Sequence, residues 1–205
     1  MSDPYVIVGL GNPGPGYAET RHNAGFWFLD LLASRSGSVF RTQTKLRADL
    51  AKTSLYGQDC ILVKPTVFMN HSGQSVRAVV DYYKIPGNRL LIAYDELDLP
   101  VGVVRLKQGG GHGGHNGLRD IFRHSRDHEF LRLRIGIGHP GVKDAVTGYV
   151  LSRPSAEQEL MTRRVISDAA DAMRDVLGND IPKAMKKLHT VNTEDTVTGR
   201  DKGSN

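Results

Sequence analysis

The stretch that decides the fold lies near the N-terminus and reads Tyr5-Val6-Ile7-Val8-Gly9-Leu10-Gly11-Asn12-Pro13-Gly14-Pro15-Gly16-Tyr17. Its apolar start predicts a buried β-strand, and the glycines and prolines that follow predict a loop at the end of that strand. His22 and Asn23 come shortly after the loop, where an apolar helical pattern begins. A strand, a loop and a helix in this order are typical of an α/β fold.

The same loop also matches the dinucleotide-binding pattern G-x-G-x-x-G over residues 9–14. That pattern requires a helix to open inside the loop, because the helix N-terminus holds the pyrophosphate. Pro13 and Pro15 remove N–H donors and keep the residues before them out of the helical region of backbone angles. The acidic residue that normally follows about 20 positions later is also missing. We therefore expect a rigid loop that presents Asn12 beside His22, and no nicotinamide site.

The remaining sequence continues the alternation of strands and helices. Strand patterns cover residues 5–10, 46–55, 60–65, 90–95, 103–107 and 131–137. Helical patterns cover residues 22–35, 73–84, 116–124, 156–177 and 180–189. Residues 56–59 form a plausible hairpin turn, which makes the sheet mixed. We expect one α/β domain over residues 1–189, with helices on both faces of the sheet, and a disordered tail over residues 190–205.

Composition limits the setting in which the chain works. Cys60 is the only cysteine among 205 residues, so no disulfide framework exists, as is usual in a reducing cytoplasm. There is no signal-like start and no apolar run of about 20 residues, so we expect a cytoplasmic protein with no membrane segment. The formal net charge is +5, and basic residues gather between residues 105 and 143. This gathering fits a solvated face or a surface for a polyanion.

Polar residues follow four of the expected strands, where groups that bind or react collect in open α/β sheets. The four places hold Asn12 with His22, residues 68–70, Asp95, and the glycine-rich stretch 109–117. An aspartate that accepts the ring N–H of a histidine fixes its tautomer and stabilises the imidazolium. Asp95 is a candidate partner for His22 in this sense. The alternative, that Asp95 only caps the following turn, remains open at this point.

No nucleophile accompanies this histidine. The G-x-S-x-G elbow is missing and Cys60 falls inside a strand pattern, so a His–Asp pair would have to activate water. Asparagine amides then become candidate donors to a developing oxyanion. His112 and His115 lack the spacing of a helical zinc site, and no cysteine pair or acidic triad joins them. We expect no metal and no cofactor.

Taken together, the loops resemble bacterial peptidyl-tRNA hydrolase. The matching blocks are Gly9-Leu10-Gly11-Asn12-Pro13-Gly14, Arg21-His22-Asn23-Ala24-Gly25, Phe68-Met69-Asn70, Asp95-Glu96-Leu97-Asp98-Leu99-Pro100, Gly110-Gly111-His112-Gly113-Gly114-His115-Asn116-Gly117-Leu118 and Arg132-Leu133-Arg134-Ile135-Gly136-Ile137-Gly138. They occur in order and span residues 5 to about 190 of the chain. Agreement across ordered blocks is far more specific than any single block.

The resemblance implies a twisted mixed sheet surrounded by helices, and a monomeric, metal-independent esterase that frees tRNA from peptidyl-tRNA. It implies that His22 activates water, that Asp95 supports His22, and that Asn12 takes part in catalysis. The substrate and tRNA contacts that it implies are Asn12, Tyr17, Phe68, Met69, Asn70, Asn116, Lys107, Arg134 and Lys143. Among these, Lys107 and Arg134 would contact the tRNA 5′-phosphate and Lys143 the acceptor stem. The rival interpretations are an RNA-binding protein without catalysis and a nicotinamide-dependent oxidoreductase.

Overall fold

A seven-stranded mixed sheet forms the centre of the molecule, with strands in the order β2-β3-β4-β1-β5-β7-β6. The computed structural model describes residues 3–125 and 127–194. The strands are β1 (Tyr5–Gly9), β2 (Arg41–Gln43), β3 (Ala48–Leu55), β4 (Gln58–Pro65), β5 (Leu90–Glu96), β6 (Val104–Gln108) and β7 (Leu131–Gly136). The central strands β4, β1, β5 and β7 run parallel, and the pairs nearer the two edges are antiparallel. The mixed α/β architecture expected from the sequence is therefore confirmed.

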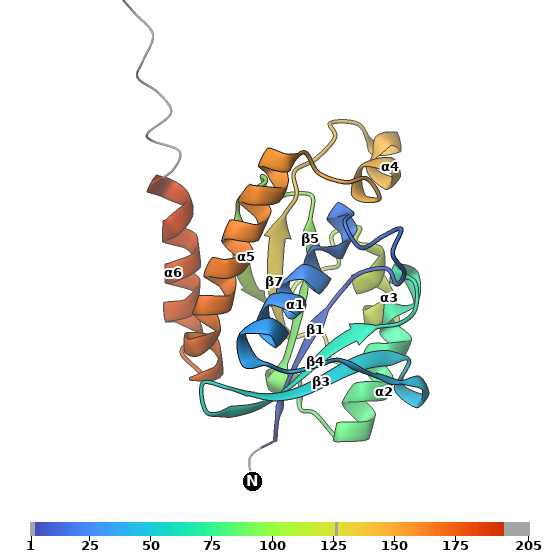
Figure 1. The fold of residues 1–205 in the computed structure, drawn as a ribbon, viewed down its shortest axis with the longest axis vertical. Helices are drawn as coiled ribbons and strands as arrows, with labels where there is room; N and C mark the ends of the chain where they lie inside the picture. The colour runs from blue at the N-terminus through green and yellow to red at the C-terminus, as the bar shows by residue number, and fades with distance from the viewer. Residues whose placement is uncertain (1–2, 126, 195–205) are drawn as a thin grey trace, which may run out of the picture.

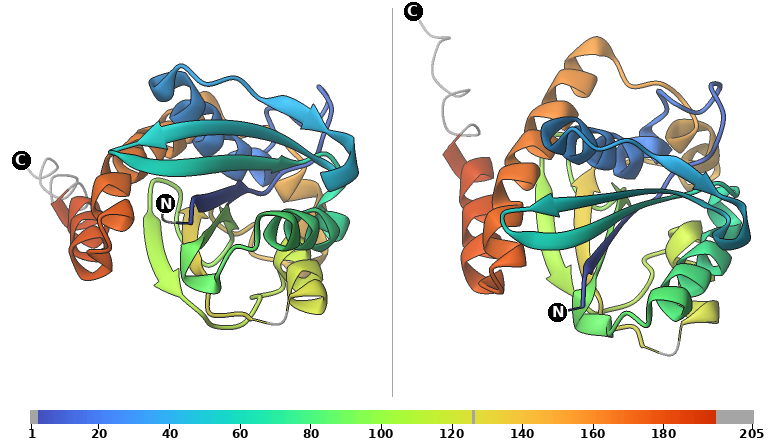
Figure 2. Two further views of the ribbon diagram at one scale, coloured as in Figure 1. Left: turned by 90° about the horizontal axis from the view of Figure 1, so that it is seen from below. Right: turned by 60° about the horizontal axis from the view of Figure 1, so that its bottom comes forward.

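Helices cover both faces of this sheet (Figure 1). The helices are α1 (Ala24–Ser36), α2 (Ser72–Tyr83), α3 (Asn116–His124), α4 (Val146–Val150), α5 (Ala156–Leu177) and α6 (Ile181–Glu194). One buried cluster joins the sheet to α1, α5 and α6, and a second joins its other face to α2 and α3. Figure 2 shows these two helical layers on opposite sides of the strands. Within the described residues, no helix is long and apolar enough to span a membrane.

Burial on both faces explains the unbroken apolar pattern of β1. Successive side chains of a strand point to opposite faces. Tyr5 and Ile7 accordingly pack in the cluster with α1 and α5, whereas Val6 and Val8 pack in the cluster with α2 and α3. A strand buried in this way loses the alternation of a half-exposed strand and becomes a continuous apolar run.

Most elements lie within a few residues of their expected positions, and the differences have local causes. The hairpin turn is shorter than expected, because only Tyr56 and Gly57 separate β3 from β4, with φ angles of 51° and 79°. Positive φ at both central residues is the requirement of a type I′ turn. Strand β2 and helix α4 were not predicted, because three exposed residues and a five-residue helix are too short to show a periodic pattern.

The C-terminal helix corrects part of the expected tail. Helix α6 continues to Glu194, so residues 190–194, which were expected to be disordered, are helical. The predicted helix ended at residue 189, next to the buried Leu188, but a helix can continue past the residues that anchor it. The rest of the expected tail, residues 195–205, lies outside the described residues.

Gly25 sets how closely α1 approaches the sheet. A Cβ atom at Gly25 would overlap the carbonyl oxygen of Ala93 in β5 and the backbone of Leu10. A Cβ atom at Gly9 would in turn overlap the carbonyl group of Gly25. Two glycines thus allow backbone-to-backbone contact between α1 and the ends of β1 and β5, a close approach that a side chain would block.

We expect Gly25→Ala to lower the free energy of unfolding by about 1–3 kcal/mol, as overpacking does. The measurement is urea unfolding followed by circular dichroism. Gly16→Ala is the matched control, because no atom lies within 4 Å of a Cβ placed at Gly16. Equal urea midpoints for the two variants would contradict the close approach.

Candidate active site

A cleft of about 540 Å³ opens where the parallel strands β1, β4 and β5 end. Its wall includes the expected site residues Asn12, Tyr17, His22, Phe68, Met69, Asn70, Asp95 and Asn116. These residues come from four separate segments of the chain. They meet at the carboxyl ends of the strands, where open α/β sheets generally bind their ligands, at the point where the strand order reverses.

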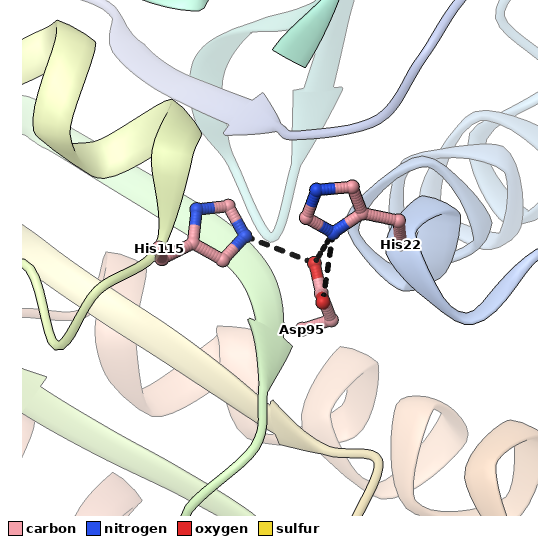
Figure 3. Close-up of side chains that lie close together, drawn as sticks. All are labelled: His22, Asp95 and His115. Atoms are coloured by element: carbon pink, nitrogen blue, oxygen red, sulfur yellow. Dashed lines mark hydrogen bonds and ion pairs between the residues drawn. The ribbon is translucent and has the colours of Figure 1, made fainter. Parts of the chain in front are cut away.

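A buried carboxylate lies at the base of this cleft and is shared by two imidazoles (Figure 3). The Nδ1 atom of His22 lies 2.9 Å from both carboxylate oxygens of Asp95. The Nε2 atom of His115 lies 3.0 Å from Oδ1 of the same carboxylate. Asp95 is 2% exposed and His22 is 7% exposed, so solvent hardly screens these contacts. The alternative role of Asp95 as a simple turn cap does not account for this geometry.

His115 was missed as a member of the site, because its sequence context was weighed only for a zinc site with His112. In the structure, His115 is the N-cap of α3, and its Nδ1 accepts the N–H of Leu118 at 3.3 Å. An acceptor at Nδ1 requires the proton on Nε2, which therefore donates to Asp95. The place of His115 immediately before a helical pattern was the only signal in the sequence.

Charge and burial act in opposite directions on Asp95 and His22. Burial alone would raise the pKa of Asp95, but His22 and His115 stabilise the carboxylate and hold its pKa well below the usual range. Burial would likewise lower the pKa of His22, but the charge and hydrogen bond of Asp95 outweigh it and raise the pKa. Asp95 is thus an anion that fixes the Nδ1–H tautomer of His22. The other ring nitrogen, Nε2, is left as a base.

A clamp made by Asn23 fixes Asn12 in place. The Asn23 side chain accepts the backbone N–H of Asn12 at 2.9 Å and donates to its carbonyl oxygen at 3.0 Å. The Asn12 side-chain oxygen accepts the N–H of Met69 at 2.8 Å. With its oxygen occupied, the Asn12 amide offers its NH₂ group as a donor. The sequence contained Asn23 in a matching block, but nothing in the pattern showed this contact.

The loop that bears Asn12 does not have the conformation of a dinucleotide-binding loop. Helical structure begins only with a turn of 3₁₀ helix at Arg21–Asn23, well after Gly14. The helix N-terminus that would bind a pyrophosphate is therefore not part of the glycine pattern. The sequence-based rejection of a nicotinamide site agrees with this geometry.

An aromatic pair forms part of the rim of the cleft. The rings of Tyr17 and Phe68 meet edge to face, with centroids 5.9 Å apart. Phe68 is 53% exposed, which is high for a large apolar side chain. Met69 behind it is buried, and Asn70 is exposed on the turn of 3₁₀ helix Met69–His71. Residues 68–70 therefore all line the cleft as expected, and they offer it an exposed aromatic ring, a buried apolar chain and an exposed amide.

Arg21 holds the opposite wall, which the sequence analysis did not identify. That wall consists of residues 146–151, at and after α4. The Arg21 guanidinium donates to the carbonyl oxygens of Tyr149, Ser152 and Arg153 at 3.1–3.3 Å and lies 4.2 Å from the centroid of the Tyr149 ring. The residue next to His22 thus ties the two sides of the cleft to each other.

The expected phosphate-binding residues lie outside the cleft. Lys107 on β6 and Lys143 on a 3₁₀ turn are exposed. Arg134 is already engaged, since its Nε lies 3.0 Å from Oε2 of Glu96, a buried carboxylate that lines the cleft. Arg119, which was not assigned to the site, lines the cleft directly. The basic residues therefore differ in how freely they could contact a phosphate, a difference that the sequence did not show.

One set of side chains in the described part of the chain has the spacing of metal ligands, namely His22, Asp95 and His115. His112, which the sequence analysis had considered together with His115, is not in the set. Hydrogen bonding alone accounts for the positions of the three side chains, because both imidazoles donate to the carboxylate. A cation could bind there only if the imidazole nitrogens that face Asp95 first lost their protons.

Comparison with known proteins gives one consistent result. The model of the family described as peptidyl-tRNA hydrolase matches residues 6–196. The peptidyl-tRNA hydrolases of Halorhodospira halophila and Alcanivorax borkumensis are both 52% identical to this chain; the alignments cover 90% and 92% of this chain and 95% and 98% of those proteins. The crystal structure of peptidyl-tRNA hydrolase from Acinetobacter baumannii superimposes with a TM-score of 0.88 at 45% identity, over 92% of this chain and 95% of that one. The resemblance noted in the sequence is confirmed: this chain belongs to the peptidyl-tRNA hydrolase family.

Proposed function

We propose that this protein hydrolyses the ester bond between the peptide and the tRNA of peptidyl-tRNA and releases the tRNA for reuse. Family membership supports the reaction. The observation that carries the mechanism is the contact of His22 Nδ1 with the buried carboxylate of Asp95. That contact leaves Nε2 of His22 to act as a general base on water, which is worth on the order of 10² to 10⁴ in rate.

In this mechanism His22 takes a proton from water as the oxygen attacks the ester carbonyl carbon. The tetrahedral intermediate then expels the 3′-ribose oxygen, and the imidazolium returns the proton to it. Asp95 stays ionised and stabilises the imidazolium in between. An alkoxide leaves far more readily than an amine, so no covalent intermediate is needed. Cys60 is not a competing nucleophile, because it is buried in β4 and burial raises the pKa of its thiol to about 11.

Three asparagines supply the amide groups for this chemistry in our proposal. Asn12, Asn70 and Asn116 all line the cleft that also contains His22 and Asp95. One amide donor aimed at a developing oxyanion is typically worth roughly 3–4 kcal/mol. The Asn12 amide is the most firmly held of the three, since its backbone and its side-chain oxygen are both fixed by hydrogen bonds. Tyr17, Phe68 and Met69 add contact area for the peptide and the tRNA end.

The tRNA lies, in this proposal, across the basic surface outside the cleft. Lys107 and Arg134 contact the 5′-phosphate and Lys143 contacts the acceptor stem. Double-stranded RNA is recognised largely through its shape and backbone, which suits exposed lysines. We further propose that the reaction needs neither a cofactor nor a metal ion, because imidazole and amide groups meet the needs of ester hydrolysis. We also propose that the protein works as a monomer in the cytoplasm.

Replacing the base tests the mechanism directly. We expect His22→Ala to lower kcat for peptidyl-tRNA more than 100-fold, because general-base catalysis is lost, with little change in tRNA binding. His124→Ala is the matched control, since His124 also lies beside a carboxylate, that of Asp120 at 3.6 Å, but away from the cleft. Near-normal turnover by His22→Ala would contradict the assignment of His22 as the general base.

The pH profile gives a second test. Water activation needs unprotonated His22, so kcat/KM rises as the pH passes upward through the pKa of His22. Asp95 raises that pKa, so the acidic limb of the profile should lie above the ordinary histidine value of about 6.5.

Asp95→Asn should move this limb to lower pH, because only the opposing effect of burial remains, and it should lower kcat about 10²- to 10⁴-fold. Asp171→Asn is the control, since Asp171 pairs with Arg35 on the surface. A limb that stays in place in Asp95→Asn would mean that another group is the base.

The basic residues are separated by comparing a full peptidyl-tRNA with a short peptidyl-adenosine ester. Lys107→Ala should raise KM for the tRNA substrate and flatten its salt dependence, with little effect on the short ester. Arg134→Ala should lower activity on both substrates, because it leaves the buried Glu96 carboxylate in the cleft wall without its ion pair. Equal losses on both substrates for Lys107→Ala would rule out its proposed phosphate contact.

A further inference from the structure

Arg132 on β7 has the most deeply buried charged side chain near the cleft. It is 1% exposed, and its guanidinium lies 5.1 Å from the centroids of both the Phe122 and the Phe130 rings. It donates from Nη1 to the carbonyl oxygen of Gly111 at 2.6 Å and from Nη2 to that of Gly110. Its Nε has no hydrogen-bond partner within the described residues. A buried cation held by carbonyls and rings is expensive, and its position therefore calls for an explanation.

The partners of Arg132 identify the segment that it holds. Gly110 and Gly111 belong to a glycine run in which residues 109, 110, 113 and 114 all have positive φ. Glycines supply no side chains to pack, so such a segment has little of its own to fix its path. The two carbonyl contacts of Arg132, together with the edge of the His112 ring on Phe122, attach it to the sheet and to α3.

The held segment leads directly to His115 and Asn116. The backbone N–H of His115 donates to the carbonyl oxygen of His112 at 2.9 Å, so the end of the glycine run sets where α3 begins. His115 in turn donates to Asp95. A continuous path of contacts therefore runs from the Arg132 guanidinium through the glycine run to the carboxylate that orients His22.

We propose that Arg132 is a positioning residue: by gripping the carbonyl groups of Gly110 and Gly111 it fixes the glycine run, and so places His115 on Asp95 and Asn116 in the cleft. The inference rests on the role proposed above for Asp95 and His22. A lysine cannot reproduce this grip, because a guanidinium offers two parallel N–H donors and an ammonium does not. Arginine is thus required for its shape as well as its charge.

The test is Arg132→Lys, which keeps the positive charge and removes the two parallel N–H donors of the guanidinium. We expect kcat to fall about 10-fold, in line with the cost of a small misplacement of catalytic groups. Amide hydrogen exchange at residues 109–115 should become faster, while the rest of the sheet stays protected. Arg89→Lys is the matched control, since Arg89 also stacks on a ring, that of Tyr5 at 4.3 Å, and is not among the residues that line the cleft.

A double-mutant cycle with His115→Ala distinguishes positioning from general stability. If Arg132 acts through His115, Arg132→Lys should cost less than 2-fold in the His115→Ala background, against about 10-fold alone. Both single variants should also shift the acidic limb of kcat/KM upward, because an Asp95 carboxylate without its second donor binds the His22 proton more strongly.

Several results would overturn the proposal. Multiplicative losses in the cycle, or unchanged exchange at residues 109–115, would leave Arg132 a purely structural residue. If His115→Ala lowers turnover and Arg132→Lys does not, the positioning role alone fails. If His115→Ala itself keeps full turnover, the positioning role also fails, because the placing of His115 then has no effect on catalysis, while the His22–Asp95 mechanism stands. Should Arg132→Lys not fold, Phe122→Leu removes the ring between Arg132 and His112 and must give the same loop exchange and the same limb shift.

Discussion

The site depends on one interaction, the buried carboxylate of Asp95 shared between two imidazoles. Without a neighbouring cation or donor, a carboxylate at this depth would take up a proton. His22 and His115 supply the donors that keep it ionised, and its charge in turn keeps His22 basic. Asp95 and His22 thus hold each other in their charged and basic states, and His115 supplies the second donor to the carboxylate, although the three residues lie far apart in the sequence.

The fold brings these three side chains together. Asp95 is the second-last residue of β5, His22 lies in the turn that leads into α1, and His115 caps α3. Helices α1 and α3 lie on opposite faces of the sheet, so their N-terminal ends reach the same carboxyl edge from both sides (Figures 1 and 3). The close backbone contacts of Gly9 and Gly25 bring α1, and with it His22, near the end of β5. On the other face, we attribute the placement of His115 on Asp95 to the hold of Arg132 on the glycine run.

Sequence patterns predicted the parts of this arrangement that follow from periodicity. The strand before Asn12 and the strand that contains Asp95 are largely continuous apolar runs, and polar groups gather where such strands end, so the His22–Asp95 pairing could be anticipated. Asn23, Arg21 and Arg132 could not, because each acts on backbone carbonyls or amides of a distant segment and leaves no spacing rule behind. The same reason hid the engagement of Arg134 with Glu96.

The basic composition of the chain therefore serves two different purposes. Arg21 and Arg132 are 8% and 1% exposed and donate to main-chain carbonyl oxygens, and Arg21 also donates to the side chains of Ser152 and Gln158, so they contribute rigidity and no phosphate-binding surface. Lys107 and Lys143 remain exposed to solvent. A guanidinium suits the first purpose because its fork bridges two carbonyl groups, and an ammonium suits the second because its charge acts without fixed geometry. The contrast between these two buried arginines and these two exposed lysines follows from that chemistry, and it makes net charge alone a poor measure of how much of this surface can bind RNA.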